Sequence, residues 1–314
     1  MMDITLHLGP HRTASTCFQH YMLENASHLE KARIGFWGPS HTRNGLLSGV
    51  IPVPGAGRFP AHQFRRARGR IALNLQRLQR TGLHHLVISD ENMIGAPRRN
   101  LRSSRLYTGI GERMARFGDA FDGRVTRVVL SIRSQESYWA SVAAFAVARG
   151  HRVPGADDLD RLVTTNRHWR EVICDLACAL PEAELLILPY EVYGSLPERK
   201  LTLMTGLANP PRTHARDWLN RSPSLARLRQ ILRDRGADPA ELLPAGDGRW
   251  YPFDMEQTMA LREAYADDLF WLRAGADGMA TLIEETGPAE MGKTPPPAMT
   301  TRGHPHDIEK RRLA

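Results

Sequence analysis

Short apolar runs alternate with segments of helical spacing along the first two thirds of the chain. Four such runs lie at residues 4–8, 85–89, 125–132 and 184–191, and a shorter one at 34–39 is either a strand or a turn. Strands separated by helices pair in parallel, because each helix carries the chain back across the sheet. The alternation therefore predicts an α/β fold, a parallel sheet flanked by helices, with a helical C-terminal part.

The same spacing locates the helices and the limits of the folded part. Residues 38–60, rich in glycine and proline, form a loop long enough to cover a site. Residues 287–314 have the composition of a disordered tail, which leaves one α/β domain over residues 1–286. Helices are predicted at about 15–32, 61–80, 134–150, 220–235 and 254–274.

The charge of the chain narrows the class of partner. The net charge is +8, and only Lys31, Lys200, Lys293 and Lys310 among the 42 cationic residues are lysines. Arginine binds phosphate and sulfate through two parallel hydrogen bonds, so a polyanionic ligand is expected. No zinc-finger spacing and no aromatic RNA-binding signature occurs, and nucleic acid is therefore not the expected partner.

Cysteine content and hydropathy indicate the cellular compartment in which the protein is expected. Three cysteines cannot form a disulfide framework, which fits a reducing environment. Cys174 and Cys178 are four residues apart and are expected to face the core from one helix. No stretch approaches the ~18 apolar residues of a membrane span, and the N-terminus lacks the cationic region of a signal peptide. The expected location is the cytoplasm, with no membrane span.

The segment LHLGPHRTASTCFQHYM, residues 6–22, joins the first predicted strand to a helix through a basic and hydroxyl-rich loop. Such a loop presents unpaired backbone N–H groups and the positive end of the helix dipole to an anion. Arg12 adds a cation, and Thr13, Ser15 and Thr16 add hydroxyl donors. The segment therefore predicts an anion site at the start of the chain.

This loop is not a nucleoside-triphosphate P-loop. When the pattern GxxxxGK[ST] is aligned on Gly9, Ala14 occupies the second glycine position and Ser15 the lysine position. The cation stands instead at Arg12, three positions earlier. A nucleotide kinase is consequently a weaker hypothesis, although it stays open.

The stretch HRTAST resembles the 5′-phosphosulfate loop of sulfotransferases that use 3′-phosphoadenosine 5′-phosphosulfate (PAPS). Arg12 takes the position of the family's lysine and Ala14 that of its glycine. A second match lies in LSIRSQESYWASVAAF, where Arg133 follows a strand and Ser141 comes eight residues later. The resemblance implies that Arg133 and Ser141 hold the 3′-phosphate of the donor.

The resemblance also covers LLILPYEVY, where a strand precedes Tyr190 and Glu191, to which we assign a structural role. It implies a P-loop-type α/β sulfotransferase fold and transfer of a sulfuryl group from PAPS to a hydroxyl or amine of a carbohydrate or other small metabolite, leaving adenosine 3′,5′-bisphosphate (PAP). No metal is expected in the reaction. The residues implied to bind the donor are Arg12, Thr13, Ala14, Ser15, Thr16, Arg133 and Ser141.

The acceptor must lose a proton, so a general base is expected near the loop. Glu91, in VISDENMIG, directly follows the second long strand, and glutamate serves as base in carbohydrate-modifying members of the family that the loop resembles. His11 and His41 are the alternatives, since phenol-sulfating members use histidine. Arg12, Glu91 and His11 are thus the candidate catalytic residues.

Two positions depart from the family pattern. Arginine at position 12 stabilises charge but does not release a proton, and Ala14 is strained if the loop needs a positive φ there. These departures keep a second hypothesis open, a nucleotide- or polyanion-binding relative without turnover. No pattern in the sequence identifies the acceptor or the oligomeric state.

Overall fold

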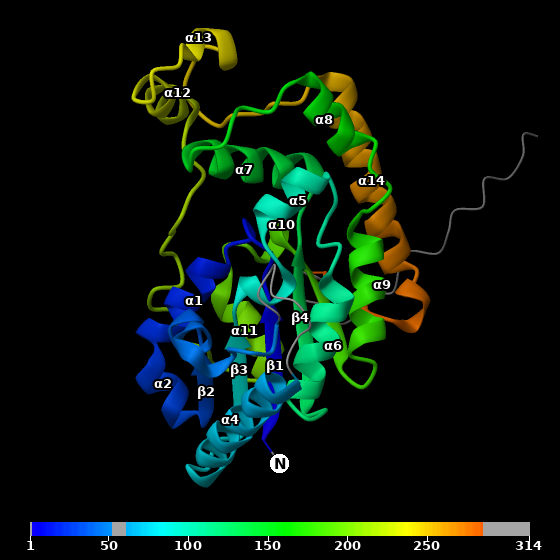
Figure 1. Cartoon of the computed structure of the whole chain (residues 1–314). Helices are drawn as coiled ribbons and strands as arrows, with labels where there is room; N and C mark the ends of the chain where they lie inside the picture. The colour runs from blue at the N-terminus through cyan, green and yellow to red at the C-terminus, as the bar shows by residue number, and fades with distance from the viewer. Residues whose placement is uncertain (1, 52–60, 285–314) are drawn as a thin grey trace, which may run out of the picture. The chain divides into compact units, whose positions relative to one another are not determined.

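A six-stranded sheet forms the centre of the protein in the computed structural model, which describes residues 2–51 and 61–284 (Figure 1). All neighbouring strands are parallel, and their order is β2-β3-β1-β4-β5-β6. This confirms the predicted α/β class. The strands are β1 (Asp3–Leu8), β2 (Ile34–Trp37), β3 (His85–Ser89), β4 (Val125–Ile132), β5 (Glu184–Pro189) and β6 (Thr281–Leu282).

The apolar runs predicted most of these strands closely. The run at 34–39 is indeed a strand, β2. The strand predicted over 184–191 ends at Pro189, because Tyr190 and Glu191 already begin the short helix α10 (Tyr190–Tyr193). The edge strand β6 was not predicted, since a strand of two residues has no period to detect.

Each segment predicted to be helical contains a helix, one of them divided, whereas the helices at Pro97–Ser103, Ile110–Ala120 and Pro197–Thr205 were not predicted. The helix expected over 15–32 breaks at Asn25, whose side-chain amide donates to the Tyr21 carbonyl oxygen at 2.9 Å. Proline is the first residue of α3, α5, α11 and α13, where its missing N–H costs nothing. Besides α10, the helices are α1 (Ser15–Glu24), α2 (Ala26–Lys31), α3 (Pro39–His41), η1 (Thr42–Leu46), α4 (Ala61–Arg80), η2 (Glu91–Ile94), α5 (Pro97–Ser103), α6 (Ile110–Ala120), α7 (Gln135–Ala148), α8 (Ala156–Val163), α9 (Trp169–Ala179), α11 (Pro197–Thr205), α12 (Leu225–Arg233), α13 (Pro239–Leu242), α14 (Met255–Arg273) and η3 (Ala276–Gly278).

Helices cover both faces of the sheet. Alternate strand residues point to opposite faces, so Val128 and Leu130 of β4 join one core whereas Val129 joins another. The first core contains side chains of α4, α6, α9 and α14, and the second contains side chains of α1, α2 and α11. The near-continuous apolar strands in the sequence are therefore explained by burial on both faces.

Helix α7 lies across the carboxyl end of the sheet (Figure 1). Its Tyr138 and Trp139 pack into the first core, while Ala143 and Val147 pack against α12 in a third, smaller core. Nearly every residue of α7 is buried, which explains why the segment is apolar on all sides. The helix thus connects the sheet to the helical C-terminal part.

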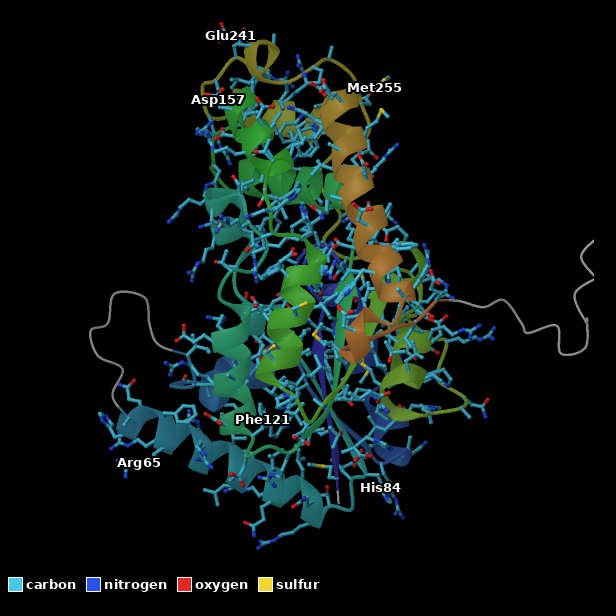
Figure 2. The ribbon with its side chains drawn as sticks, turned by 90° about the vertical axis from the view of Figure 1, so that its right-hand side faces the viewer. Arg65, His84, Phe121, Asp157, Glu241 and Met255 are labelled. Carbon is cyan, nitrogen blue, oxygen red and sulfur yellow. The ribbon has the colours of Figure 1, made fainter. Side chains whose placement is uncertain are left out.

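The strand order places a crevice at the carboxyl end of β1. Strand β1 lies between β3 and β4, and the connections after β1 and β4 leave in opposite directions. In Figure 2, His84 marks the start of β3 at one end of the sheet, whereas Met255 lies beyond the opposite, carboxyl end. Open parallel sheets bind ligands in such a crevice.

The described residues, 2–51 and 61–284, belong to one compact unit. The tail expected at 287–314 and part of the loop expected at 38–60 lie outside the described residues. Among the described helices, none combines the length and apolar character needed to cross a membrane. The prediction that Cys174 and Cys178 both face the core is wrong, because Cys178 is exposed.

The turn after β1 requires glycine. A Cβ atom on Gly9 would lie 2.4 Å from Ser15 Oγ and 2.9 Å from the His7 ring. We expect Gly9→Ala to lower the free energy of unfolding by about 1–3 kcal/mol, the usual cost of overpacking, in urea denaturation. The control Gly69→Ala lies in open space within α4 and should raise it by about 0.5–1 kcal/mol. Equal stability of the two variants would contradict this packing.

Candidate functional site

A cavity of about 630 Å³ opens at the carboxyl end of the sheet. Its walls come from the loop between β1 and α1, the start of η2, the β4–α7 connection, α7 and α10. A further wall is made by residues 218–224 and 248–249, which belong to the helical C-terminal part. Three features predicted from the sequence therefore meet at one cavity. They are the loop between β1 and α1, here called the anion loop (residues 9–14), Glu91, and the pair Arg133 and Ser141.

The loop between β1 and α1 is held by its own hydroxyl groups. The Ser15 hydroxyl donates to the Gly9 carbonyl oxygen at 2.8 Å, and the Thr13 hydroxyl donates to the Pro10 carbonyl oxygen at 2.6 Å. Thr13 is fully buried and does not line the cavity, so its side chain braces the loop and is not free to bind a ligand. The hydroxyl of Thr16 remains on the cavity wall.

Ala14 has a left-handed backbone conformation, with φ of 62°, as the residue that precedes α1. The expected strain at this position is thus present, and it costs roughly 1–2 kcal/mol in a residue with a Cβ. Within the described residues, the amide N–H groups of Ala14, Ser15 and Thr16 have no hydrogen-bond acceptor. These groups and the positive end of the α1 dipole are available to an anion.

The guanidinium of Arg12 crosses the cavity toward α7. Its Nε donates to Ser141 Oγ at 2.9 Å, and one terminal nitrogen donates to Ser222 Oγ at 2.9 Å. Burial, together with the positive charges of Arg133 and Arg149, lowers the pKa of Arg12 to about 10. Burial is the main cause of this shift and the neighbouring arginines add to it, while Arg12 stays protonated at neutral pH.

Arg133 holds the loop between β1 and α1 by a hydrogen bond to its backbone. The residue is only 4% exposed, and one of its terminal nitrogens donates to the Arg12 carbonyl oxygen at 2.6 Å. Its guanidinium lies 4.3 Å from the ring centre of Tyr190, and its Nε is buried without a partner. Burial lowers the pKa of Arg133. Arg133 and Ser141, the pair expected to hold one phosphate, both line the cavity, and each forms a hydrogen bond with Arg12.

Positive charge dominates the cavity wall. Five arginines line it, and the one carboxylate among the described lining residues is Glu91. None of the five forms an ion pair with a carboxylate of the described residues. A wall with this excess of positive charge attracts anions, which favours a ligand carrying several negative charges. The five arginines are Arg12, Arg133, Arg149, Arg221 and Arg249.

Glu91 lies on the wall, but both of its oxygens are engaged. Gln19 Nε2 donates to one oxygen at 2.9 Å, and Arg43 donates to the other at 2.8 Å. Burial alone raises the pKa of Glu91, yet these hydrogen bonds outweigh burial and lower it below the ordinary value. Glu91 is therefore an ionised carboxylate and a weak base.

His11 lies beside Glu91 on the same wall. Its Nδ1 is 3.3 Å from the Tyr107 hydroxyl, and its Nε2 is 3.2 Å from the side-chain amide of Asn92. Burial lowers the pKa of His11, so the imidazole is neutral at pH 7. The other alternative, His41, is an exposed residue at the end of α3 and does not line the cavity.

Several residues of the site carried no signal in the sequence. Tyr190 was assigned a structural role, whereas the structure places its ring beneath Arg133 and on the cavity wall. Its neighbour Glu191 does have a structural role, because it accepts from the Ser134 N–H at the start of α7. Residues 218–224 and Arg249 were missed because no motif marks segments that only the folded chain brings to the loop.

Comparison with known proteins gives no identification: neither a protein-family model nor a curated protein sequence matches this chain. The geometry of the cavity and the chemistry of its residues therefore carry the functional argument.

The burial of His11 has a measurable consequence for stability. Because its pKa is lower in the folded protein than the ordinary 6.5, the unfolded chain binds this proton first as the pH falls. His11 therefore lowers the free energy of unfolding as the pH drops below about 6.5. The test measures the free energy of unfolding in urea between about pH 7.5 and 5.5. In His11→Gln we expect its slope against pH to be smaller, by an amount equivalent to the uptake of up to one proton on unfolding. An unchanged slope would contradict a neutral, buried imidazole.

Proposed function

We propose that the protein transfers a sulfuryl group from PAPS to a hydroxyl or amine of a carbohydrate or other small metabolite. The observation that carries the proposal is the meeting of Arg12, Arg133 and Ser141 with the α1 amide groups at one arginine-rich cavity. A P-loop-type sulfotransferase fold is part of the proposal, and the parallel order around β1 supports it.

The cavity fits a bisphosphorylated nucleotide in charge and in donors. The buried Nε atoms of Arg133 and Arg249 have no hydrogen-bond partner in the part of the chain that the structure describes, although both residues lie on the wall. An unpaired buried donor costs about 1–3 kcal/mol, and a phosphate oxygen would remove that cost. We assign Arg133 and Ser141 to the 3′-phosphate, and Arg12 together with the α1 amide groups to the 5′-phosphosulfate.

When bound, PAPS supplies the sulfuryl group and a stable leaving group, PAP. The amide N–H groups of Ala14, Ser15 and Thr16 hold the negative charge that grows on the leaving phosphate. Arg12 contributes charge without releasing a proton, because arginine stays protonated even with a pKa of about 10. Stabilisation at this site is thus electrostatic.

The proton of the acceptor goes to His11 in this proposal. A base is most effective when its pKa lies near the working pH, and the neutral imidazole meets this condition better than Glu91, whose pKa is lowered by Gln19 and Arg43. Glu91 lies beside His11 and stabilises the imidazolium that forms, since its negative charge raises the pKa of His11. Glu91 is the alternative base.

Calorimetric titration with PAP tests the donor site. We expect roughly micromolar binding that weakens when adenosine 5′-monophosphate or ATP replaces PAP. Arg133→Ala should weaken PAP binding by about 1–3 kcal/mol, the scale of a lost charge-assisted hydrogen bond. The control Arg66→Ala removes an exposed arginine of α4 and should leave binding unchanged. Absence of PAP binding, or tighter binding of ATP than of PAP, would contradict the proposed function.

Two matched variants separate the candidate bases. We expect His11→Gln to lower kcat by about 100-fold or more with PAP binding retained. Glu91→Gln should lower kcat by less than about tenfold and lower the pH at which the rate falls, since Glu91 raises the pKa of His11. A large loss in Glu91→Gln and a small one in His11→Gln would move the base to Glu91.

A nucleotide- or polyanion-binding protein without turnover is the second candidate. The observation in its favour is the position of Arg12, which is bound to Ser141 and Ser222 on the far wall. Turnover by the natural protein with PAPS would exclude it, whereas turnover that begins only in Arg12→Lys would indicate a decayed enzyme. A nucleotide kinase is disfavoured, because no lysine is found among the described residues that line the cavity.

A further inference from the structure

Two histidines and an aspartate lie together on the surface, outside the cavity. His20 Nε2 lies 3.1 Å from Asp217 Oδ2, and His214 Nδ1 lies 2.8 Å from the same oxygen. The three ligand atoms are all within 4.8 Å of one another. We propose that His20, His214 and Asp217 bind a divalent transition-metal ion of the zinc class. This inference does not rest on the proposed sulfuryl transfer.

The donor set matches the chemistry of such an ion. Two imidazole nitrogens and one carboxylate oxygen form a common zinc site, with a fourth position left for water. Metal–ligand bonds of about 2.0–2.2 Å in tetrahedral geometry place the ligand atoms roughly 3.3 Å apart. The observed separations of 3.1 Å and 2.8 Å from Asp217 to the two histidines need only small adjustments. Calcium and magnesium are disfavoured, because they prefer oxygen ligands.

Glu24 places a second carboxylate near His20, too far for a hydrogen bond. It follows His20 by one turn of α1, and its Oε1 lies 3.7 Å from His20 Nδ1. A negative charge on this side of the ring favours the proton on Nδ1, which leaves the lone pair of the other nitrogen for a metal. Here the nitrogen that remains free for the metal is Nε2, which already faces Asp217.

The two segments that carry the ligands are joined by hydrogen bonds near the site. The Tyr21 hydroxyl donates to the Pro211 carbonyl oxygen at 2.6 Å, and Asn25 Nδ2 donates to the Thr213 carbonyl oxygen at 3.0 Å. Ala215, between the two ligands of the turn, is buried in the second core. The turn that carries His214 and Asp217 is therefore fixed to α1, which carries His20. A preformed site of this kind loses little freedom when it binds a metal.

The three proposed ligands lie on segments that lead directly to the cavity wall. Helix α1 begins at the anion loop, and the residues directly after Asp217 are those that line the cavity at 218–224. The Leu219 N–H donates to Cys17 Sγ at 3.3 Å, which already joins this wall to α1. A metal bound by His20 and Asp217 adds a second connection between the two. Bound metal is thus expected to restrict the motion of the 218–224 wall.

Titration of the untagged protein with Zn²⁺, and with Co²⁺ as a spectroscopic probe, tests the inference. We expect saturable binding of one ion and the visible absorption bands of tetrahedral Co²⁺ with nitrogen and oxygen ligands. His20→Gln, His214→Asn and Asp217→Asn should each weaken Zn²⁺ binding at least tenfold. Asparagine tolerates the positive φ of 60° at position 214. His28→Gln, an exposed histidine of α2, is the matched control and should bind as the natural protein does.

Hydrogen exchange gives a second, independent measurement. Zn²⁺ should slow amide exchange over residues 218–224 in the natural protein and leave it unchanged in Asp217→Asn. Failure of the natural protein to bind Zn²⁺ saturably would overturn the inference, as would equal binding by the ligand variants, which would place the ion elsewhere. Neither result depends on PAP binding, so this inference and the proposed function fail separately.

Discussion

The unpaired positive charge of Arg12 and Arg133 is the constraint on which the rest of the site depends. Arg133, which follows the carboxyl end of β4, is buried and donates to the carbonyl oxygen of Arg12. This hydrogen bond holds the loop that follows β1. Arg12 in turn reaches Ser141 on α7 and Ser222 on the far wall. Buried charge is costly unless a group of opposite charge compensates it, and an anionic ligand in the cavity would supply that compensation.

The fold places this charge where a parallel sheet can use it. Strand β1 is central, and the chain leaves β1 and β4 in opposite directions, which opens the crevice between their loops. The amide groups at the start of α1 face the same cavity as the arginines. Backbone and side-chain donors from segments more than a hundred residues apart thus line one cavity.

Much of the fold was predictable because burial on both faces leaves a strong record in the sequence. The strands β1, β3 and β4 are largely apolar and largely buried, and α4 has the apolar stripe of a helix packed on one side. The break at Asn25 was not predicted; its side-chain amide donates both to the Tyr21 carbonyl oxygen and to the distant Thr213 carbonyl oxygen, and the second contact leaves no trace in the local sequence. Contacts of this kind have no local pattern.

The sequence by itself determined the α/β class, the position of the anion loop and the identity of its residues, since local periodicity and the strand–loop–helix order are local properties. Only the tertiary structure decided which groups meet. It directs Arg12 to Ser141, pairs Glu91 with Arg43, buries His11, and brings Asp217 to His20 across the chain. Side-chain direction and burial arise from packing between distant segments, and they set the charge state of each group at the site.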